Sequence, residues 1–450
     1  MSLKRAKPVT VVPNPPSWRG LFLGAPIYPP HYPLCAGPEE AVLVLGPPRS
    51  GKTTSLVVPN LLTAPGALVT TSTKTDVLSY SAKARAGRGR TWLFDPSGTV
   101  GPGGLTPLRW SPVTGCERWE VAVGRAHAMA SAAHPARGLA YADHWTERAE
   151  ALLAPLFHAA ALGGRTMAQV LRWVQRRDVT EAVELADRSG GHEMAADAIE
   201  GVIETEERER SGIFSTAANI LAAYRLPAAL ESANEPNFDP QAFVRSSDTV
   251  YICAPASEQE HLAPLVVAFL ELVKRATYAR ETGWPPVLFV LDEVANIAPL
   301  PGLPALVSEG GGQGLVTLAC LQDLSQARAR WGAAADGFLT LFGTKLLLPG
   351  VADLYTLQLV SALAGERQVT RTSVTESGHP LAPLWGGQYA IGTTTHTERV
   401  PAMRVDEIST MRQGTALMIG PGVLPRQIGL VPAWERPWRT VIERAGAAGV

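Results

Sequence analysis

The sequence predicts an α/β fold in which helices cover both faces of a mainly parallel β-sheet and an all-α domain is inserted into that sheet domain. Short, near-continuous apolar runs alternate with helical stretches over much of the chain. Such runs are typical of strands buried on both faces of a parallel sheet. Residues 117–236 break the alternation and are almost wholly helical in character, which predicts the insertion.

The expected strands lie on either side of this helical interval. Three precede it, at 41–45, 67–71 and 91–95, and five follow it, at 249–255, 287–293, 315–321, 344–350 and 415–420. We therefore expect an α/β domain formed by residues 40–116 and 237–440, an all-α insertion at 117–236, an N-terminal arm at 1–39 and a C-terminal tail at 441–450.

Within the insertion, apolar residues recur at helical spacing in three stretches. The first spans 145–160 and is closed by the glycine pair 163–164. Thr166 is a candidate N-cap for the second, and the third spans 213–224. The proline-rich segment 226–240 is expected to be the exit linker.

Composition favours a globular protein and leaves its partner open. Apolar residues make up 46% of the 450 residues and charged residues 18%, unlike a disordered chain. Forty basic and 41 acidic side chains nearly cancel, so bulk charge neither predicts nor excludes a nucleic-acid partner. The four scattered cysteines favour free thiols over disulfides or zinc ligands. No apolar run is long enough to predict a membrane-spanning helix.

Residues 46–54 read GPPRSGKTT and match the phosphate-loop pattern G-x-x-x-x-G-K-[ST]. The strand before them and the helix-compatible segment after them are the context that this motif requires. Glycines let backbone N–H groups turn toward an anion, and the helix N-terminus adds partial positive charge. We expect the loop to bind a nucleotide through Gly46, Pro47, Pro48, Arg49, Ser50, Gly51, Lys52, Thr53 and Thr54. Lys52 is expected to contact the β- and γ-phosphates, and Thr53 to bind Mg²⁺.

A second source of carboxylates is expected at the end of the strand in PVLFVLDEVANI, residues 286–297. In a parallel sheet, the carboxyl end of that strand lies beside the phosphate loop. Asp292 is expected to hold Mg²⁺ through water and Glu293 to polarise the attacking water. The alternative is an ordinary strand end that opens into a capped helix. The nine histidines show no metal-ligand spacing, so no further metal site is expected.

Two other features leave alternatives open. Gln322 follows the apolar run 315–321, and it either senses the γ-phosphate or is an ordinary loop glutamine. Arg85, Arg88 and Arg90 form the densest basic run, and a solvated connector explains them as well as phosphate contacts do.

These motifs resemble those of the type IV secretion coupling proteins, the TraG/TraD type of conjugative ATPase. The resemblance covers most of residues 40–437 and rests on four ordered stretches. They are LGPPRSGKTTSLVVPNLL, DEVANIAPLPGLPALVSEG, LACLQDLSQARARWG and the segment 399–437. Lys74 occupies the place of a lysine in the family's second-strand signature, although the acidic residue and proline usual before it are absent.

The resemblance implies a RecA-like P-loop NTPase core with an inserted all-α domain, and ATP and Mg²⁺ as ligands. Six subunits would form a ring at the cytoplasmic mouth of a type IV secretion channel, where Lys52, Glu293 and Gln322 act in ATP hydrolysis. Hydrolysis would translocate single-stranded DNA or hand over a relaxase–DNA substrate. The helical domains would receive substrate or relaxosome proteins.

The sequence departs from the family pattern in two further places. The family usually carries an N-terminal membrane anchor, and none is found here. The expected location is therefore peripheral, at the cytoplasmic face of the inner membrane, through a missing anchor or a partner protein. Many relatives have arginines before the glutamine strand, where this chain reads EGGGQGL. The candidates for an arginine finger are then Arg328, Arg330, Arg367 and Arg371.

Two alternative functions stay open at this point. One is a cargo receptor that binds ATP mainly for assembly, which the near-neutral charge allows. The other is a double-stranded DNA pump of the FtsK type, which shares the core fold but leaves the helical insertion unexplained.

Overall fold

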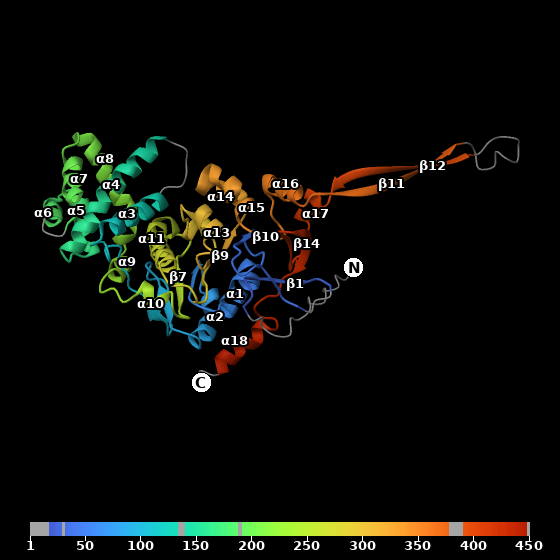
Figure 1. Cartoon of the computed structure of the whole chain (residues 1–450), viewed down its shortest axis with the longest axis horizontal. Helices are drawn as coiled ribbons and strands as arrows, with labels where there is room; N and C mark the ends of the chain where they lie inside the picture. The colour runs from blue at the N-terminus through green and yellow to red at the C-terminus, as the bar shows by residue number, and fades with distance from the viewer. Residues whose placement is uncertain (1–17, 29–31, 134–139, 188–190, 378–389, 448–450) are drawn as a thin grey trace.

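A twelve-stranded sheet runs through the centre of the protein in a computed structural model that describes residues 18–28, 32–133, 140–187, 191–377 and 390–447. The strand order is β2-β1-β14-β13-β10-β3-β9-β8-β4-β7-β5-β6. Figure 1 shows the sheet in the middle of an elongated molecule, with a helical region at one end and a two-stranded ribbon at the other. The predicted α/β class is confirmed.

The central part of the sheet is parallel. From β10 to β6 every neighbouring pair runs in the same direction. These strands are β10 (Thr344–Leu347), β3 (Val42–Leu45), β9 (Leu315–Leu321), β8 (Val287–Leu291), β4 (Leu68–Ser72), β7 (Thr249–Cys253), β5 (Thr91–Phe94) and β6 (Thr106–Pro107). Every residue of β3, β8 and β9 is buried, which explains why they read as unbroken apolar runs.

The two faces of the sheet carry separate hydrophobic cores. In β3, Leu43 and Leu45 belong to one core, and Val42 and Val44 belong to the other. Successive strand side chains point to opposite faces, so both cores need covering helices. These are α1 (Val58–Thr63), α2 (Asp76–Ala86), α11 (Gln259–Tyr278), α12 (Val294–Ile297), α13 (Leu303–Glu309), α14 (Leu324–Trp331), α15 (Phe338–Leu341), α16 (Leu354–Leu363) and α17 (Val405–Ser409).

The helical interval forms its own group of helices between β6 and β7, at the left of Figure 1. The apolar stretch in 145–160 lies on α4, where Leu152, Leu156 and Phe157 are fully buried. Thr166 stands at the N-cap of α5 in an extended conformation, but its side chain makes no cap hydrogen bond. The helices are α3 (Trp119–Ala133), α4 (Ala140–Leu162), α5 (Met167–Arg176), α6 (Thr180–Asp187), α7 (Glu193–Ile203), α8 (Glu207–Ile220), α9 (Pro227–Ser232) and α10 (Pro240–Phe243).

Part of the expected N-terminal arm belongs to the sheet instead. Strand β1 (Phe22–Pro26) pairs antiparallel with β14 (Val423–Gly429), which pairs with β13 (Thr415–Gly420), and β2 (Leu34–Cys35) pairs antiparallel with β1 at the sheet edge. The Asn60 side chain holds both backbone polar groups of Phe22, at 2.8 and 2.9 Å. Residues 1–17 of the expected arm lie outside the described residues.

The expected C-terminal tail likewise begins inside a helix. Helix α18 (Trp438–Ala447) packs its buried Trp438 edge-on against Phe22, with ring centroids 4.9 Å apart. The two ends of the described chain therefore stabilise each other.

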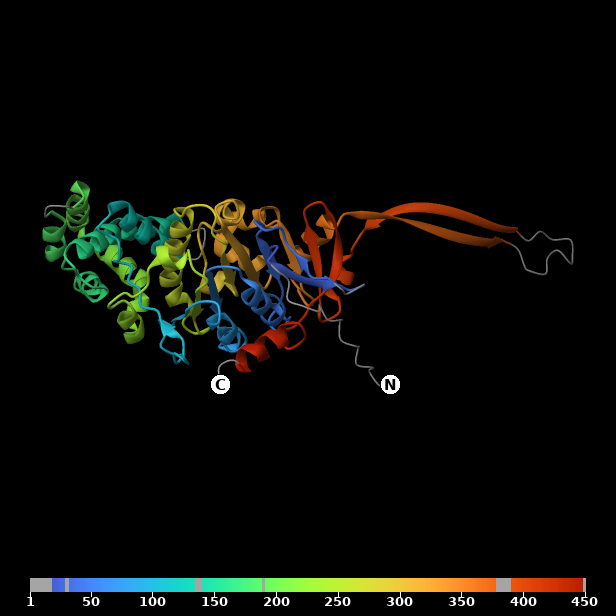
Figure 2. The same cartoon turned by 60° about the horizontal axis from the view of Figure 1, so that its bottom comes forward.

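A long ribbon projects from the body and was not anticipated. Strands β11 (Glu366–Ser377) and β12 (Ala390–Pro401) pair only with each other among the described residues. Figures 1 and 2 both show the ribbon leading away from the sheet, on the side opposite the helical region. No helix in the described ranges is long and apolar enough to cross a membrane. The four cysteines are free thiols, and three of them are buried, as predicted.

Candidate functional site

The loop 46–52 joins β3 to the helical turn Thr53–Val57, which continues into α1. The Gly46 N–H donates to the Leu321 carbonyl at 3.1 Å and so ties the loop to β9. A Cβ on Gly46 would lie 2.7 Å from Ser50 Oγ and 2.9 Å from Leu348 Cβ, and Gly51 has φ +98°. Both positions therefore require glycine, for space at the first and for backbone conformation at the second.

Lys52 folds back over this loop. Its side chain is buried, and Nζ donates to the carbonyls of Gly46 and Pro47, the latter at 3.0 Å. The hydroxyl of Ser50 is buried in the same loop and has no hydrogen-bond partner among the described residues. A buried cation held only by its own loop and a hydroxyl without a partner fit an anionic ligand.

Strand order brings Asp292 to the loop. Strands β3, β9 and β8 are parallel neighbours, so their carboxyl ends lie at one edge of the sheet. Thr53 Oγ1 donates to Asp292 Oδ2 at 2.6 Å, joining segments 239 residues apart. The Thr71 hydroxyl donates to the Asp292 carbonyl at 2.8 Å and steadies this corner. A hydroxyl and a carboxylate in contact are the hard oxygen donors that suit Mg²⁺.

Burial raises the pKa of Asp292, while the Thr53 hydrogen bond and the Lys52 charge lower it. Asp76 also lies close enough for its charge to raise the pKa of Asp292. The roles of Thr71 and Asp76 are not foreseen from the sequence. The sequence feature that could have indicated them is the group of polar residues at and just after the end of β4, the strand beside β8.

Glu293 has a left-handed backbone, with φ +53° and ψ +49°, at the N-cap of α12. Its side chain makes no cap hydrogen bond. Non-glycine residues seldom adopt this conformation, and such strain concentrates at functional sites. Glu293 still lies close enough to Asp292, the residue held by Thr53, for its charge to raise the pKa of Asp292.

Gln322 follows β9, between the ends of β3 and β8. Its backbone N–H donates to Gln326 Oε1 at 2.9 Å, and Gln326 Nε2 reaches Asn296 Oδ1 at 3.4 Å. The backbone is therefore fixed from α14, whereas the half-buried Gln322 side chain makes no hydrogen bond to another described residue. The predicted residues Lys52, Thr53, Asp292, Glu293 and Gln322 all stand at one sheet edge.

Lys74 lies on the surface just after β4, and its carbonyl accepts from Ser72 Oγ at 2.7 Å. It lies at the carboxyl ends of the parallel strands, as the phosphate loop does, but no hydrogen bond or ion pair joins it to Asp292 among the described residues.

The four arginine candidates make other contacts within the chain. Arg328 stacks on the Tyr355 ring, 3.4 Å from its centroid, and pairs with Asp336 at 3.0 Å. Arg330 donates to the carbonyl of Ala132 at the end of α3, and burial lowers its pKa to about 10.

Arg367 and Arg371 lie on the ribbon. Arg367 pairs with Glu407 at 3.8 Å, and Arg371 pairs with Glu398 at 3.4 Å. None of the four arginines bonds to the loop of its own chain in the described part of the protein. Among the described residues, Lys52 is the cation that hydrogen-bonds to the loop carbonyls, and a finger role for these arginines stays a prediction.

The basic run at the end of α2 divides in the structure. Arg85 is fully buried and binds backbone carbonyls, so neither a solvated connector nor a phosphate contact describes it. Arg88 and Arg90 stay exposed. No cluster of three metal-ligating side chains occurs elsewhere in the described ranges.

Comparison with known proteins identifies a family match over nearly the whole chain. Residues 7–429 match the model of the family described as type IV secretory system conjugative DNA transfer. Two conjugal transfer proteins TraG from Escherichia coli are 26% identical over 404 residues and 24% identical over 409. These matches cover 84% and 85% of this chain. The chain spans 62% and 63% of the relatives' own lengths, less than two thirds.

Solved structures of the plasmid coupling protein TrwB share the fold. The complex with ADP and Mg²⁺ aligns with a TM-score of 0.65, and the complex with the ATP analogue ADPNP with 0.67. Each is 18% identical and covers 95% of this chain and 90% of TrwB.

Proposed function

The chain belongs to the type IV secretory system conjugative DNA transfer family, and from this premise we propose that it is an ATP-hydrolysing coupling protein. It recruits single-stranded DNA bound to a relaxase, or protein substrates, and drives them into a type IV secretion channel. The observation that carries the proposal is the hydrogen bond between Thr53 and Asp292, which joins the phosphate loop to the carboxylate strand.

ATP is held by the backbone N–H groups of the loop and by Lys52, which exchanges its contacts with the Gly46 and Pro47 carbonyls for phosphate oxygens. Thr53 and Asp292 would hold Mg²⁺ beside the phosphates. When bound, Mg²⁺ neutralises charge on the phosphates. TrwB, which shares the fold, has been solved with ADP and Mg²⁺.

Hydrolysis falls to Glu293 and Gln322. Glu293 orients the attacking water and accepts its proton, while the γ-phosphoryl group moves to that water and ADP leaves with the electron pair of the broken bond. The Asp292 carboxylate is held by Thr53, whereas the Glu293 side chain makes no cap hydrogen bond, which suits a group that must engage water. Gln322 has a free side chain and a fixed backbone, which suits a group that responds to the γ-phosphate.

The assembly we propose is a ring of six chains at the cytoplasmic face of the inner membrane, attached through an anchor or a partner protein. The helical region α3–α8 receives cargo. The intrachain contacts of the four arginines fit a site that a neighbouring subunit completes, since in trans an arginine can reach the γ-phosphate only after assembly.

The test is the rate of ATP hydrolysis with and without single-stranded DNA, on material of known oligomeric mass. Lys52→Ala should abolish turnover. Glu293→Gln should keep nucleotide binding and lower the rate by about two orders of magnitude or more, because it removes the proton acceptor. Glu231→Gln, an exposed glutamate on α9, is the matched control. Normal hydrolysis by Glu293→Gln would show that the general base lies elsewhere.

A cargo receptor for which ATP is an assembly ligand is the second candidate. The near balance of 40 basic and 41 acidic residues supports it, because it provides no bulk attraction for DNA. DNA affinity that falls steeply with salt favours the motor. Affinity that ignores salt, together with ATP-dependent assembly, favours the receptor.

A further inference from the structure

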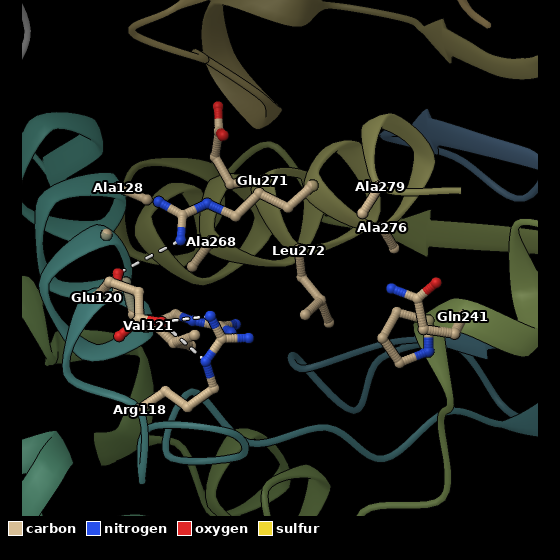
Figure 3. A pocket seen from close by; sticks show the side chains of 14 residues that line it. Arg118, Glu120, Val121, Ala128, Gln241, Ala268, Glu271, Leu272, Ala276 and Ala279 are labelled. Carbon is tan, nitrogen blue, oxygen red and sulfur yellow. Dashed lines mark hydrogen bonds and ion pairs between the residues drawn. The ribbon is translucent and has the colours of Figure 1, made fainter. Parts of the chain in front are cut away.

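A pocket of about 280 Å³ lies between α3 of the helical region and α11, with the start of α10 at its side. Figure 3 shows the helix that carries Glu120 and Val121 facing the helix that carries Ala268 and Leu272, with Gln241 opposite. The pocket is formed by elements different from those of the phosphate loop. Three arginines line it: Arg118, Arg125 and Arg275.

Arg125 is a buried cation without a counterion. Its side chain is 4% exposed, and it makes no hydrogen bond or ion pair with any described residue. One face of the guanidinium lies over Trp110, 4.7 Å from the ring centroid. Burial lowers the pKa of Arg125 to about 10, so it stays charged at neutral pH. Buried charges in proteins are normally paired and hydrogen-bonded, so this arginine lacks an anion.

Arg275 reaches the same pocket from α11 across Gly124. A Cβ at position 124 would lie 1.9 Å from Arg275 Nη2, so glycine makes room for the guanidinium. The hydrogen bond of Arg275 to a neighbour is a long one, 3.5 Å from Nη1 to the Glu120 carbonyl. No carboxylate pairs with Arg275 in the part of the chain that the structure describes.

The acidic residues of the pocket are already neutralised. Glu120 forms an ion pair with Arg118, and Glu271 pairs with Lys274 at 2.5 Å. In Figure 3 the carboxyl group of Glu271 points away from Arg118. The charge that remains to be matched is that of Arg125 and Arg275.

Two more buried donors lie beside Arg125. Trp110 Nε1 and Tyr224 Oη are both buried, and neither has a hydrogen-bond partner in the part of the chain that the structure describes. Trp110 stacks on Arg125. Burial raises the pKa of Tyr224, and the charge of the nearby Arg125 partly offsets that rise. Neither of these two residues lines the pocket, so they act on a ligand there only through Arg125. Within the pocket, the guanidinium groups of Arg125 and Arg275 are the donors that need acceptors, and they favour a ligand that supplies oxygen atoms.

We propose that this pocket binds the phosphate group of a small phosphorylated anion, held by Arg125 and Arg275. Planar guanidinium groups bind phosphate oxygens in pairs, and two of them can share one di- or pyrophosphate. A terminal phosphate fits better than a nucleic-acid backbone, because Arg125 is buried and a phosphate flanked by sugars on both sides is too bulky to approach it. Such a ligand would bridge α3 and α11, and so hold the helical region against the sheet domain.

Inorganic pyrophosphate is the probe, measured by calorimetry at low ionic strength in a Lys52→Ala background that weakens the phosphate loop. Arg125→Met and Arg275→Met should each weaken binding by at least about tenfold, because each removes a charged donor from a desolvated contact. Arg225→Met, an exposed arginine of the same helical region, should leave binding unchanged. Arg275 is exposed, so its variant is expected to fold even where Arg125→Met does not.

The melting temperature gives a second readout. Arg125→Met replaces a cation that lacks a partner with an apolar chain of similar length, so the ligand-free protein should melt at the same or a higher temperature. Pyrophosphate should raise the melting temperature of the Lys52→Ala protein and not that of the double variants. Equal weakening by Arg225→Met, an equal response to chloride, or competition by an oligonucleotide without terminal phosphate would each overturn the proposal.

Discussion

Replacing Arg85 is expected to destabilise the fold strongly. Arg85 is fully buried in the last turn of α2 and makes four hydrogen bonds. Nε donates to Thr249 Oγ1 at 2.7 Å, and Nη1 to the Ala64 carbonyl at 2.9 Å. Nη2 donates to the carbonyls of Gly66 at 3.0 Å and Ser247 at 2.9 Å. One side chain therefore joins the segments that enter β4 and β7, two neighbours in the sheet.

Arg85→Met keeps most of the apolar stem and leaves four acceptors without this donor. Hydrogen bonds to a charged group contribute about 1.5–3 kcal/mol each, but removing the charge also relieves its desolvation, which lowers the pKa of Arg85 to about 10. The expected net loss in the free energy of unfolding is about 3–5 kcal/mol, as when one partner is removed from a buried charged network. Arg88→Met is the matched control, because this exposed arginine makes one such bond, to Ala64 at 2.8 Å. It should cost about 1 kcal/mol.

The measurement is urea unfolding of both variants at pH 7.5, followed by circular dichroism, with equal m-values required for the comparison. An equal decrease in the free energy of unfolding for Arg85→Met and Arg88→Met would refute the reasoning, because burial and the number of hydrogen bonds would then not affect stability. Unfolding in two separate transitions would show instead that the helical region and the sheet domain unfold apart.

Two further predictions concern the loop and the α3–α4 contact. Gly46→Ala places a Cβ 2.9 Å from Leu348 Cβ and should weaken nucleotide binding at least about tenfold. Gly101→Ala is the control, because a Cβ at position 101 has no neighbour within 4 Å, and it should leave binding unchanged. Titration with a fluorescent nucleotide measures both affinities. His127 Nδ1 lies 3.0 Å from a Glu150 carboxylate oxygen, and this hydrogen bond raises the pKa of His127. Because the folded pKa is the higher one, the pair stabilises the fold below about pH 6.5 and is lost as pH rises through the folded pKa. Glu150→Gln should therefore lower the melting temperature at pH 6 and leave it unchanged at pH 9; an equal drop at both values would contradict an ionic role.

The elements predicted well are those whose signal is local. The strands β3, β8 and β9 are apolar throughout because helices cover both of their faces, so their positions follow from composition alone. The edge strands β1 and β2 and the ribbon β11–β12 give no such signal. The two short edge strands lie in a proline- and glycine-rich stretch, and the described ribbon side chains are mostly exposed and polar on both faces. Neither pattern differs from that of a loop.

The phosphate loop is readable from local sequence, because nine consecutive residues contain its glycines, its lysine and its hydroxyls. The sequence also singled out Asp292 and Glu293 as the end of a buried strand. The contact between Asp292 and Thr53, 239 residues apart, comes from the fold, since it depends on the order in which β3, β9 and β8 lie in the sheet. The burial of Arg125 was likewise decided by tertiary structure. Whether a charged side chain is covered depends on what distant segments pack against it, and no local pattern records that.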